Sequence, residues 1–76
     1  MSQPAAVNET LIHRANQVAA HFAAYPAEHA AREVERHLRR YWEPRIRRSL
    51  LAQPTEALHP LVRQALAGLR ADAAAQ

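Results

Sequence analysis

Hydrophobic side chains recur along the first half of the chain at alternating spacings of three and four residues. This is the period that gives an α-helix one apolar face. The first set predicts a helix that ends before Pro26, capped by Asn8 or Thr10, and it comprises Leu11, Ala15, Val18, Phe22 and Tyr25. The second set predicts a helix over residues 27–43, and it comprises Ala27, Ala31, Val34, Leu38 and Tyr41.

The second half of the chain continues the helical pattern in shorter pieces. Ile46 and Leu50 share one face of a predicted third helix over residues 44–52, and a break follows at residues 53–56. Pro60 begins a predicted fourth helix, whose apolar row comprises Leu61, Val62, Ala65, Leu66 and Leu69. No stretch alternates in the manner of a strand. The sequence therefore predicts an all-α fold, a small bundle of three to four helices. We expect a single domain over residues 1–76, with flexible tails at 1–7 and 71–76.

A proline separates the second and third predicted helices. Proline lacks an amide donor and disfavours the α conformation in the residue before it, so Glu43 should end one helix and Pro44 should begin the next. We call this junction the corner, and Tyr41 and Trp42 immediately precede it. Tyrosine, tryptophan and arginine are enriched at the energetic centres of protein interfaces. The corner is therefore a candidate docking surface.

The two aromatic residues at the corner allow more than one interpretation. An aromatic pair at the end of an amphipathic helix usually belongs to the core. Alternatively, Tyr41 packs inside while Trp42 stays partly exposed, with its indole N–H available to a partner. The composition also favours burial against a partner. The chain is short, and much of its 49% hydrophobic content is alanine, which buries little surface.

All ten basic residues are arginine, and the formal net charge is +3. Six of them cluster between residues 36 and 48, at Arg36, Arg39, Arg40, Arg45, Arg47 and Arg48. The cluster is either a solvated face paired with glutamates or a surface for an acidic protein. Nucleic-acid binding fits less well, because glutamates at positions 33, 35 and 43 interrupt a continuous basic face.

Catalytic and metal chemistry find little support in the sequence. The chain has no cysteine, its single glycine excludes a glycine-rich phosphate loop, and Ser49 has no acid nearby. Four histidines, His13, His21, His29 and His37, recur every eight residues. That spacing is about 12 Å along a helix, too far for two ligands of one ion. We expect no catalytic, cofactor or metal site on this chain, although a metal site assembled from different helices stays open.

The sequence also predicts a location. No apolar run is long enough to cross a bilayer, and the first residues lack the basic and apolar regions of a secretory signal. We therefore expect a cytoplasmic protein without a membrane partner.

Three segments together resemble one family. Residues 14–22 read RANQVAAHF, residues 37–47 read HLRRYWEPRIR, and residues 58–62 read LHPLV. They are similar to the patterns ANQIA-x-F, HLRRFWDPRMR and LSPLV of the delta subunit of soluble, NAD-dependent, molybdenum-containing formate dehydrogenases of bacteria. The middle segment is specific, and the likeness covers roughly residues 11–69. His59 stands where the family commonly has serine, which we expect to weaken a helix cap.

The resemblance implies a non-catalytic accessory subunit of an enzyme complex that oxidises formate to carbon dioxide with NAD. It also implies that the molybdenum cofactor, iron–sulfur clusters and FMN sit on larger subunits. The expected partners are these larger subunits, chiefly the catalytic alpha subunit, whose assembly or stability this chain would support. The residues expected to carry partner specificity are Asn16, Gln17, Arg40, Trp42, Arg45 and Arg47.

Two other functions stay open. The chain could be a transient chaperone for assembly or cofactor insertion of the same enzyme, or a small basic regulator that binds nucleic acid. One residue role is also open, because Arg45, directly after Pro44, could close the corner by donating to helix-end carbonyls instead of binding a partner.

Overall fold

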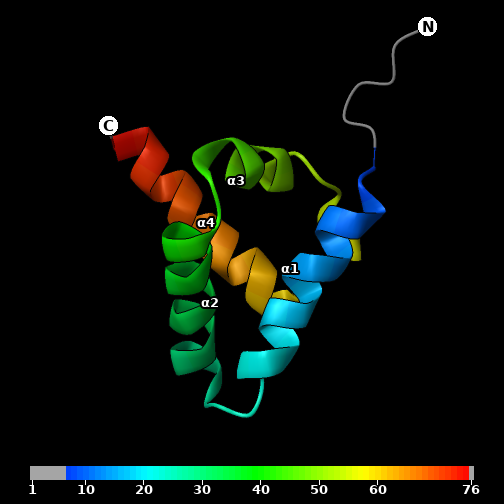
Figure 1. The fold of residues 1–76 in the computed structure, drawn as a ribbon. Coiled ribbons are helices and arrows are strands. Elements are labelled where there is room, and N and C mark those ends of the chain that lie inside the picture. Colours follow the sequence, from blue (N-terminus) through cyan, green and yellow to red (C-terminus); the bar gives the residue numbers. More distant parts are fainter. Residues whose placement is uncertain (1–6, 76) are drawn as a thin grey trace, which may run out of the picture.

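The computed structural model describes residues 7–75, and these residues form helices and connecting turns without a strand. The helices are α1 (Glu9–Phe22), α2 (Ala27–Tyr41), α3 (Pro44–Leu51) and α4 (Pro60–Ala75), with a short 3-10 helix, η1 (Thr55–Ala57), between the last two (Figure 1). The predicted all-α bundle with a proline-marked corner is confirmed.

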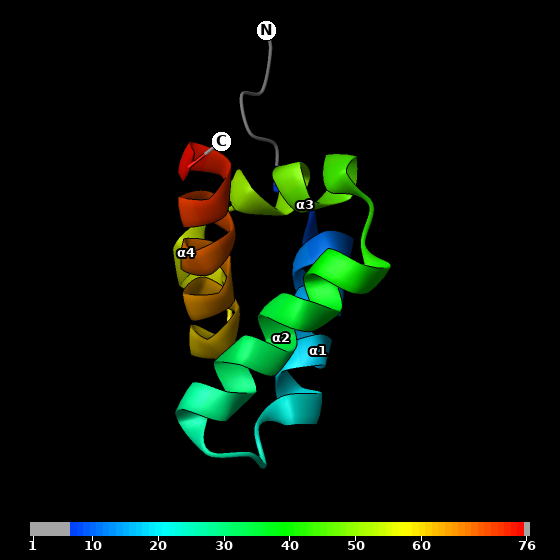
Figure 2. The same ribbon diagram turned by 90° about the vertical axis from the view of Figure 1, so that its left-hand side faces the viewer.

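The helices form two layers closed at one end. Helices α1 and α2 run antiparallel as a hairpin, and α4 packs across one side of that hairpin, with its most extensive contact on α2 (Figures 1 and 2). Helix α3 lies across the end of the bundle and bridges the two layers (Figure 2). The opposite side of the hairpin is therefore left without a covering helix in the described part of the chain.

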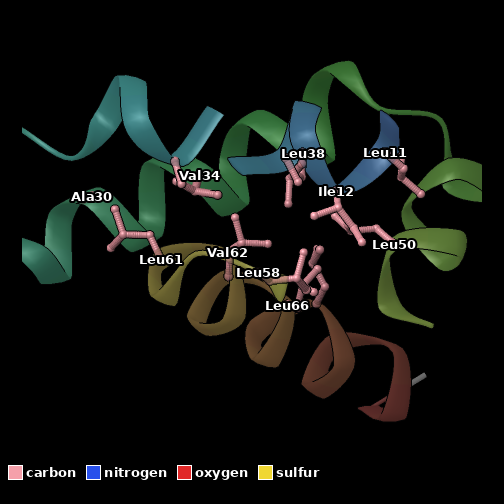
Figure 3. Close-up of a cluster of buried hydrophobic side chains, with 14 residues drawn as sticks. Leu11, Ile12, Ala30, Val34, Leu38, Leu50, Leu58, Leu61, Val62 and Leu66 are labelled. Carbon is pink, nitrogen blue, oxygen red and sulfur yellow. The ribbon is translucent and has the colours of Figure 1, made fainter. Parts of the chain in front are cut away.

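One hydrophobic core lies between these layers. Its largest fully buried side chains are Val34, Leu38, Leu50, Val62 and Leu66, which come from α2, α3 and α4 (Figure 3). Alanines at the helix contacts are also fully buried, at Ala15, Ala19, Ala30 and Ala65. Because alanine has only a methyl group, it lets helix backbones approach closely. The predicted row on the fourth helix is confirmed in full.

The buried faces of α1 and α2 are rotated relative to the predicted ones. The buried row of α2 is Ala30, Val34 and Leu38, whereas Ala27 and Tyr41 are exposed. On α1, Ile12 and Ala19 are buried, and Val18 and Phe22 are only half-buried. The rotation points each helix toward α4 as well as toward its hairpin partner, so one apolar edge of the hairpin remains on the surface.

Local signals account for most helix ends. Asn8 Oδ1 accepts a hydrogen bond of 3.0 Å from the Leu11 amide, so Asn8 rather than Thr10 caps α1. Helix α1 ends at Phe22, three residues earlier than the pattern through Tyr25 predicted. Pro26 disfavours the helical conformation in Tyr25, the residue before it. The Tyr25 amide instead donates to the Phe22 carbonyl and closes a turn.

Helix α2 ends two residues earlier than predicted, at Tyr41. Both Trp42 (φ −101°, ψ 134°) and Glu43 (φ −64°, ψ 148°) are extended, and Pro44 then occupies the first turn of α3. The proline restricts only Glu43 directly. Trp42 leaves the helix as well, which allows its side chain to pack against the core.

Helix α4 continues through Ala75, although residues 71–76 were expected to form a tail beyond it. Alanine has the highest helix propensity, and this segment is mostly alanine. Most of the tail predicted at the other end, together with Gln76, lies outside the described residues. Val7 is described, and it is exposed and precedes α1.

Candidate docking surface

Three shallow grooves mark the uncovered side of the α1–α2 hairpin, which we call the hairpin face. The first, the corner groove, has a volume of about 400 Å³ and is lined by Asn8, Thr10, Leu11, Arg14, Tyr41, Trp42, Glu43 and Ile46. The second, about 480 Å³, is lined by Phe22, Glu33, Arg36, His37, Arg40 and Tyr41. The third, about 380 Å³, is lined by Arg14, Gln17, Val18, His21, Phe22 and His37.

The three grooves form one continuous surface, because they share walls. Tyr41 separates the first groove from the second, Phe22 and His37 separate the second from the third, and Arg14 joins the third to the first. None of the lining residues belongs to α4. The hairpin face is thus spatially distinct from the side that packs on α4.

Aromatic and imidazole rings run along this face in a connected array. The Phe22 ring makes edge-on contacts with His21 (4.8 Å between centroids) and Tyr25 (5.8 Å), and reaches His37 on α2 at 6.2 Å. His37 lies 4.9 Å from Tyr41, and Tyr25 lies 5.2 Å from His29. Rings fixed against one another in this way lose little further side-chain entropy when a partner covers them.

The large hydrophobic side chains exposed in the described residues gather on or beside the same face. Tyr41 is 67% exposed, Tyr25 46% and Ile46 39%, while Val7 precedes Asn8 at the corner groove. Large apolar side chains that stay in water on one side of a small domain indicate an interaction surface.

The residues that line the three grooves include three arginines, Arg14, Arg36 and Arg40, and two acids, Glu33 and Glu43. Arg39 pairs with Glu35 and with Asp72 of α4, and Glu33 lies near His29 and Arg36. The hydrogen bonds that Arg39 donates to the Glu35 carboxylate are the main cause of the raised pKa of Arg39. Gly68 leaves room for the Glu35 carboxylate, since a Cβ there would collide with it. Among the described residues, no carboxylate lies within ion-pair distance of Arg14, Arg40 or Arg45.

A comparison with protein-family models shows to which family this chain belongs. The model described as NADH-dependent formate dehydrogenase delta subunit FdsD matches residues 10–66. The chain belongs to this family. No match was found among curated proteins or among solved structures.

The matched segment begins in the first turn of α1 and ends within α4, so it contains the corner and every residue that lines the three grooves except Asn8. As a delta subunit, the chain is an accessory component of formate dehydrogenase and not its catalytic subunit. Its partners are accordingly other subunits of a formate dehydrogenase complex. The resemblance stated from the three sequence segments is confirmed.

The interpretation that Tyr41 packs inside while Trp42 stays partly exposed is confirmed for Trp42 and wrong for Tyr41. Tyr41 does not pack inside; it is the most exposed large hydrophobic side chain in the described residues. Trp42 is half-buried, packs against the core and also lines the corner groove. The reason is the early end of α2, which turns Trp42 toward the core and leaves Tyr41 on the outer edge of the last helical turn.

Arg47, and not Arg45, closes the corner. Arg47 Nη1 donates to three carbonyl oxygens at the end of α2, those of Leu38 (3.3 Å), Arg39 (3.1 Å) and Trp42 (2.6 Å). The Leu38 carbonyl also accepts from the Trp42 amide, and all three oxygens lie at the negative end of the α2 dipole, where a guanidinium is favourable. Arg45 is exposed, and its guanidinium makes no hydrogen bond within the described chain. Arg45 thus remains available to a partner, as Arg47 does not.

The remaining predicted residues also divide into two groups. Asn16 is half-buried and ties α1 to the loop before α4, because its Nδ2 donates to the Ala57 carbonyl (3.0 Å) and its Oδ1 accepts from the His59 amide (2.8 Å). Gln17 is exposed and lines the third groove, and Arg40 is exposed and lines the second. The hairpin face therefore brings together Gln17, Arg40 and Trp42, whereas Arg45 lines none of the three grooves.

Two structural polar residues were missed by the sequence analysis. Gln53 is buried and joins the end of α3 to α1, since its Oε1 accepts from the Asn8 amide (2.8 Å) and its Nε2 donates to the Ser49 carbonyl (3.2 Å). His59 Nδ1 accepts from the Leu61 amide at 3.0 Å and so caps α4. His59 thus takes the acceptor role of the serine common in the family, because an imidazole nitrogen can accept the same amide hydrogen.

The described residues also bear on metal and membrane binding. They contain no group of three or more potential ligands that could hold a metal ion, and no helix among them is long and apolar enough to span a membrane. Without a cysteine, the chain has no thiolate for an iron–sulfur cluster.

Proposed function

We propose that this chain is a non-catalytic subunit that binds the large molybdenum-containing catalytic subunit of an NAD-dependent formate dehydrogenase. Binding occurs through the hairpin face, and it supports the assembly or stability of the enzyme. The observation that carries this proposal is the continuous run of three grooves on the side of the hairpin that α4 leaves uncovered.

The chemistry of the hairpin face supports a protein partner. Tyrosine, tryptophan and arginine supply most of the strong contacts in protein interfaces, and Tyr41, Trp42 and Arg40 lie together here. Nucleic acid is a weaker candidate because Arg39 is engaged by two carboxylates and Arg47 by backbone carbonyls. The arginines that remain are separated by exposed aromatic side chains rather than joined in one basic stripe.

The proposal assigns the redox groups to other chains. The molybdenum cofactor, iron–sulfur clusters and FMN would sit on the larger subunits of a bacterial, cytoplasmic complex. This chain would act on the catalytic subunit only by covering part of its surface. A transient chaperone could use the same face, and the two roles differ in how long the complex lasts.

The test is co-expression of a tagged chain with the other formate dehydrogenase subunits, followed by size-exclusion chromatography and mass spectrometry. Co-elution in fixed proportion with the cofactor-loaded enzyme is the expected result. Binding only to cofactor-free catalytic subunit would replace the permanent subunit by a chaperone. Absence of binding to either form would overturn the proposal.

A further inference from the structure

We infer that the corner groove receives an apolar side chain carried by an acidic segment of the catalytic subunit. This inference rests on the proposed function and adds the chemistry of the contact to it. Of the three grooves, the corner groove is the one where a buried apolar floor, exposed apolar walls and an unpaired arginine, Arg14, occur together.

The corner groove is large enough to receive a large apolar side chain. Leu11, which is 7% exposed, and the half-buried Trp42 provide apolar surface at its base, while Tyr41 and Ile46 stand exposed beside it. Its volume of about 400 Å³ lies at the low end of the range for sites that enclose small ligands. An inserted aliphatic or aromatic group would cover four apolar side chains that come from three different helices or their caps.

Hydrogen bonds within the chain fix two of the residues that line the groove, Asn8 and Trp42. The Asn8 amide is bonded to Gln53, and the Asn8 side chain caps α1. On the other side, the Trp42 carbonyl is bonded to Arg47 at 2.6 Å. A preformed groove binds more tightly than a mobile one because less conformational entropy is lost on docking.

The charges around the corner groove favour an acidic segment as the carrier of the inserted apolar side chain, which we call the anchor. Arg14 lines the groove, and Arg40, which lines the adjoining groove, has its guanidinium 5.8 Å from the centre of the Tyr41 ring. Glu43 is the single acid among the lining residues. The surroundings of the groove are therefore net positive, and carboxylates flanking the anchor would find unpaired guanidinium groups.

A second copy of the chain is a poorer occupant. In a two-fold dimer the same patch meets itself, so the arginines around the groove would approach arginines of equal charge. Like charges across an interface are unfavourable, whereas an acidic segment removes the repulsion and gains ion pairs.

The experiment measures the affinity of purified chain variants for the isolated catalytic subunit at several salt concentrations. Tyr41→Ala and Ile46→Ala remove exposed walls, and each should raise Kd about tenfold or more. Arg40→Glu should also raise Kd about tenfold and should flatten the dependence of Kd on salt. Arg63→Glu on α4 makes the same charge change away from the hairpin face and should alter Kd less than about twofold.

Each outcome separates the inference from the proposed function. If the wild-type chain does not bind the catalytic subunit, the proposed function fails. If the wild-type chain binds and the groove variants bind equally well, only the inference fails. An equal loss of affinity for Arg40→Glu and Arg63→Glu would also overturn the inference. So would the finding that the wild-type chain forms a dimer that Tyr41→Ala dissociates. Circular dichroism of each variant verifies that the exposed substitutions leave the fold intact.

Discussion

The same two helices present two very different sides. Toward α4, the hairpin offers alanines, Val34 and Leu38, all fully or almost fully buried. Away from α4, it offers Phe22, Tyr25 and Tyr41, large rings that remain partly or largely in water. Alanine, valine and leucine side chains sit where the chain packs against itself, and the larger aromatic rings remain partly in solvent. This is the reverse of what a self-sufficient domain needs, and it suggests that the second side is completed by another chain.

The largest expected effect comes from the side that faces α4. Leu38→Ala should lower the free energy of unfolding by about 2–5 kcal/mol, because Leu38 is fully buried and the deletion leaves a cavity. Urea unfolding followed by circular dichroism measures the change. Tyr41→Ala, one helical turn away, should change it by less than about 0.5 kcal/mol. Similar losses for both variants would mean that the hairpin face belongs to the core.

Trp42 lies between the two sides and should affect binding most. Trp42→Ala should weaken association with the catalytic subunit by about 2 kcal/mol or more, the usual threshold for a hot spot. Isothermal titration calorimetry, at a temperature where circular dichroism shows the variant to be folded, gives the value. Wild-type affinity in the variant would assign Trp42 to the core alone.

Arg47 and Arg45 form a matched pair with opposite predictions. Arg47→Ala should reduce stability by about 1–3 kcal/mol, because three carbonyls lose their charged donor. Arg45→Ala should leave stability within about 0.5 kcal/mol of wild type and should instead reduce the salt dependence of binding. Thermal unfolding measures the stability of both variants, and binding at several salt concentrations measures their effect on association. An equal loss of stability in the two variants would contradict the prediction.

The smallest effect is expected at His59. Replacement by alanine should lower stability by about 0.5–2 kcal/mol through loss of the α4 cap. His59→Ser should retain most of that stability, since a hydroxyl can accept the same amide hydrogen. Urea midpoints of the two variants provide the comparison, and indistinguishable midpoints would show that the cap contributes little.

Periodicity and proline positions were enough to predict the four helices and the corner. They could not separate the two sides of the hairpin, because Val34, Leu38 and Tyr41 fit one helical row whether that row faces α4 or solvent. The sequence pattern also could not predict whether Arg45 or Arg47 donates to the carbonyls at the end of α2, since both are close to Pro44 in sequence. Asn16 and Gln53 join segments more than forty residues apart, and no local signal reports such bonds.

Helix α3 has only one fully buried residue, Leu50, yet side-chain hydrogen bonds link it and the residues just after it to every other α-helix. Arg47 reaches α2, Gln53 reaches the residue that caps α1, and Arg70 of α4 donates to the Leu51 carbonyl. A helix attached in this way opens locally more readily than the core helices. Since α3 carries Ile46, each opening removes one wall of the corner groove, so local unfolding and partner binding compete for the same segment. When a partner binds, the backbone amides of α3 should therefore exchange their hydrogens more slowly than in the free chain.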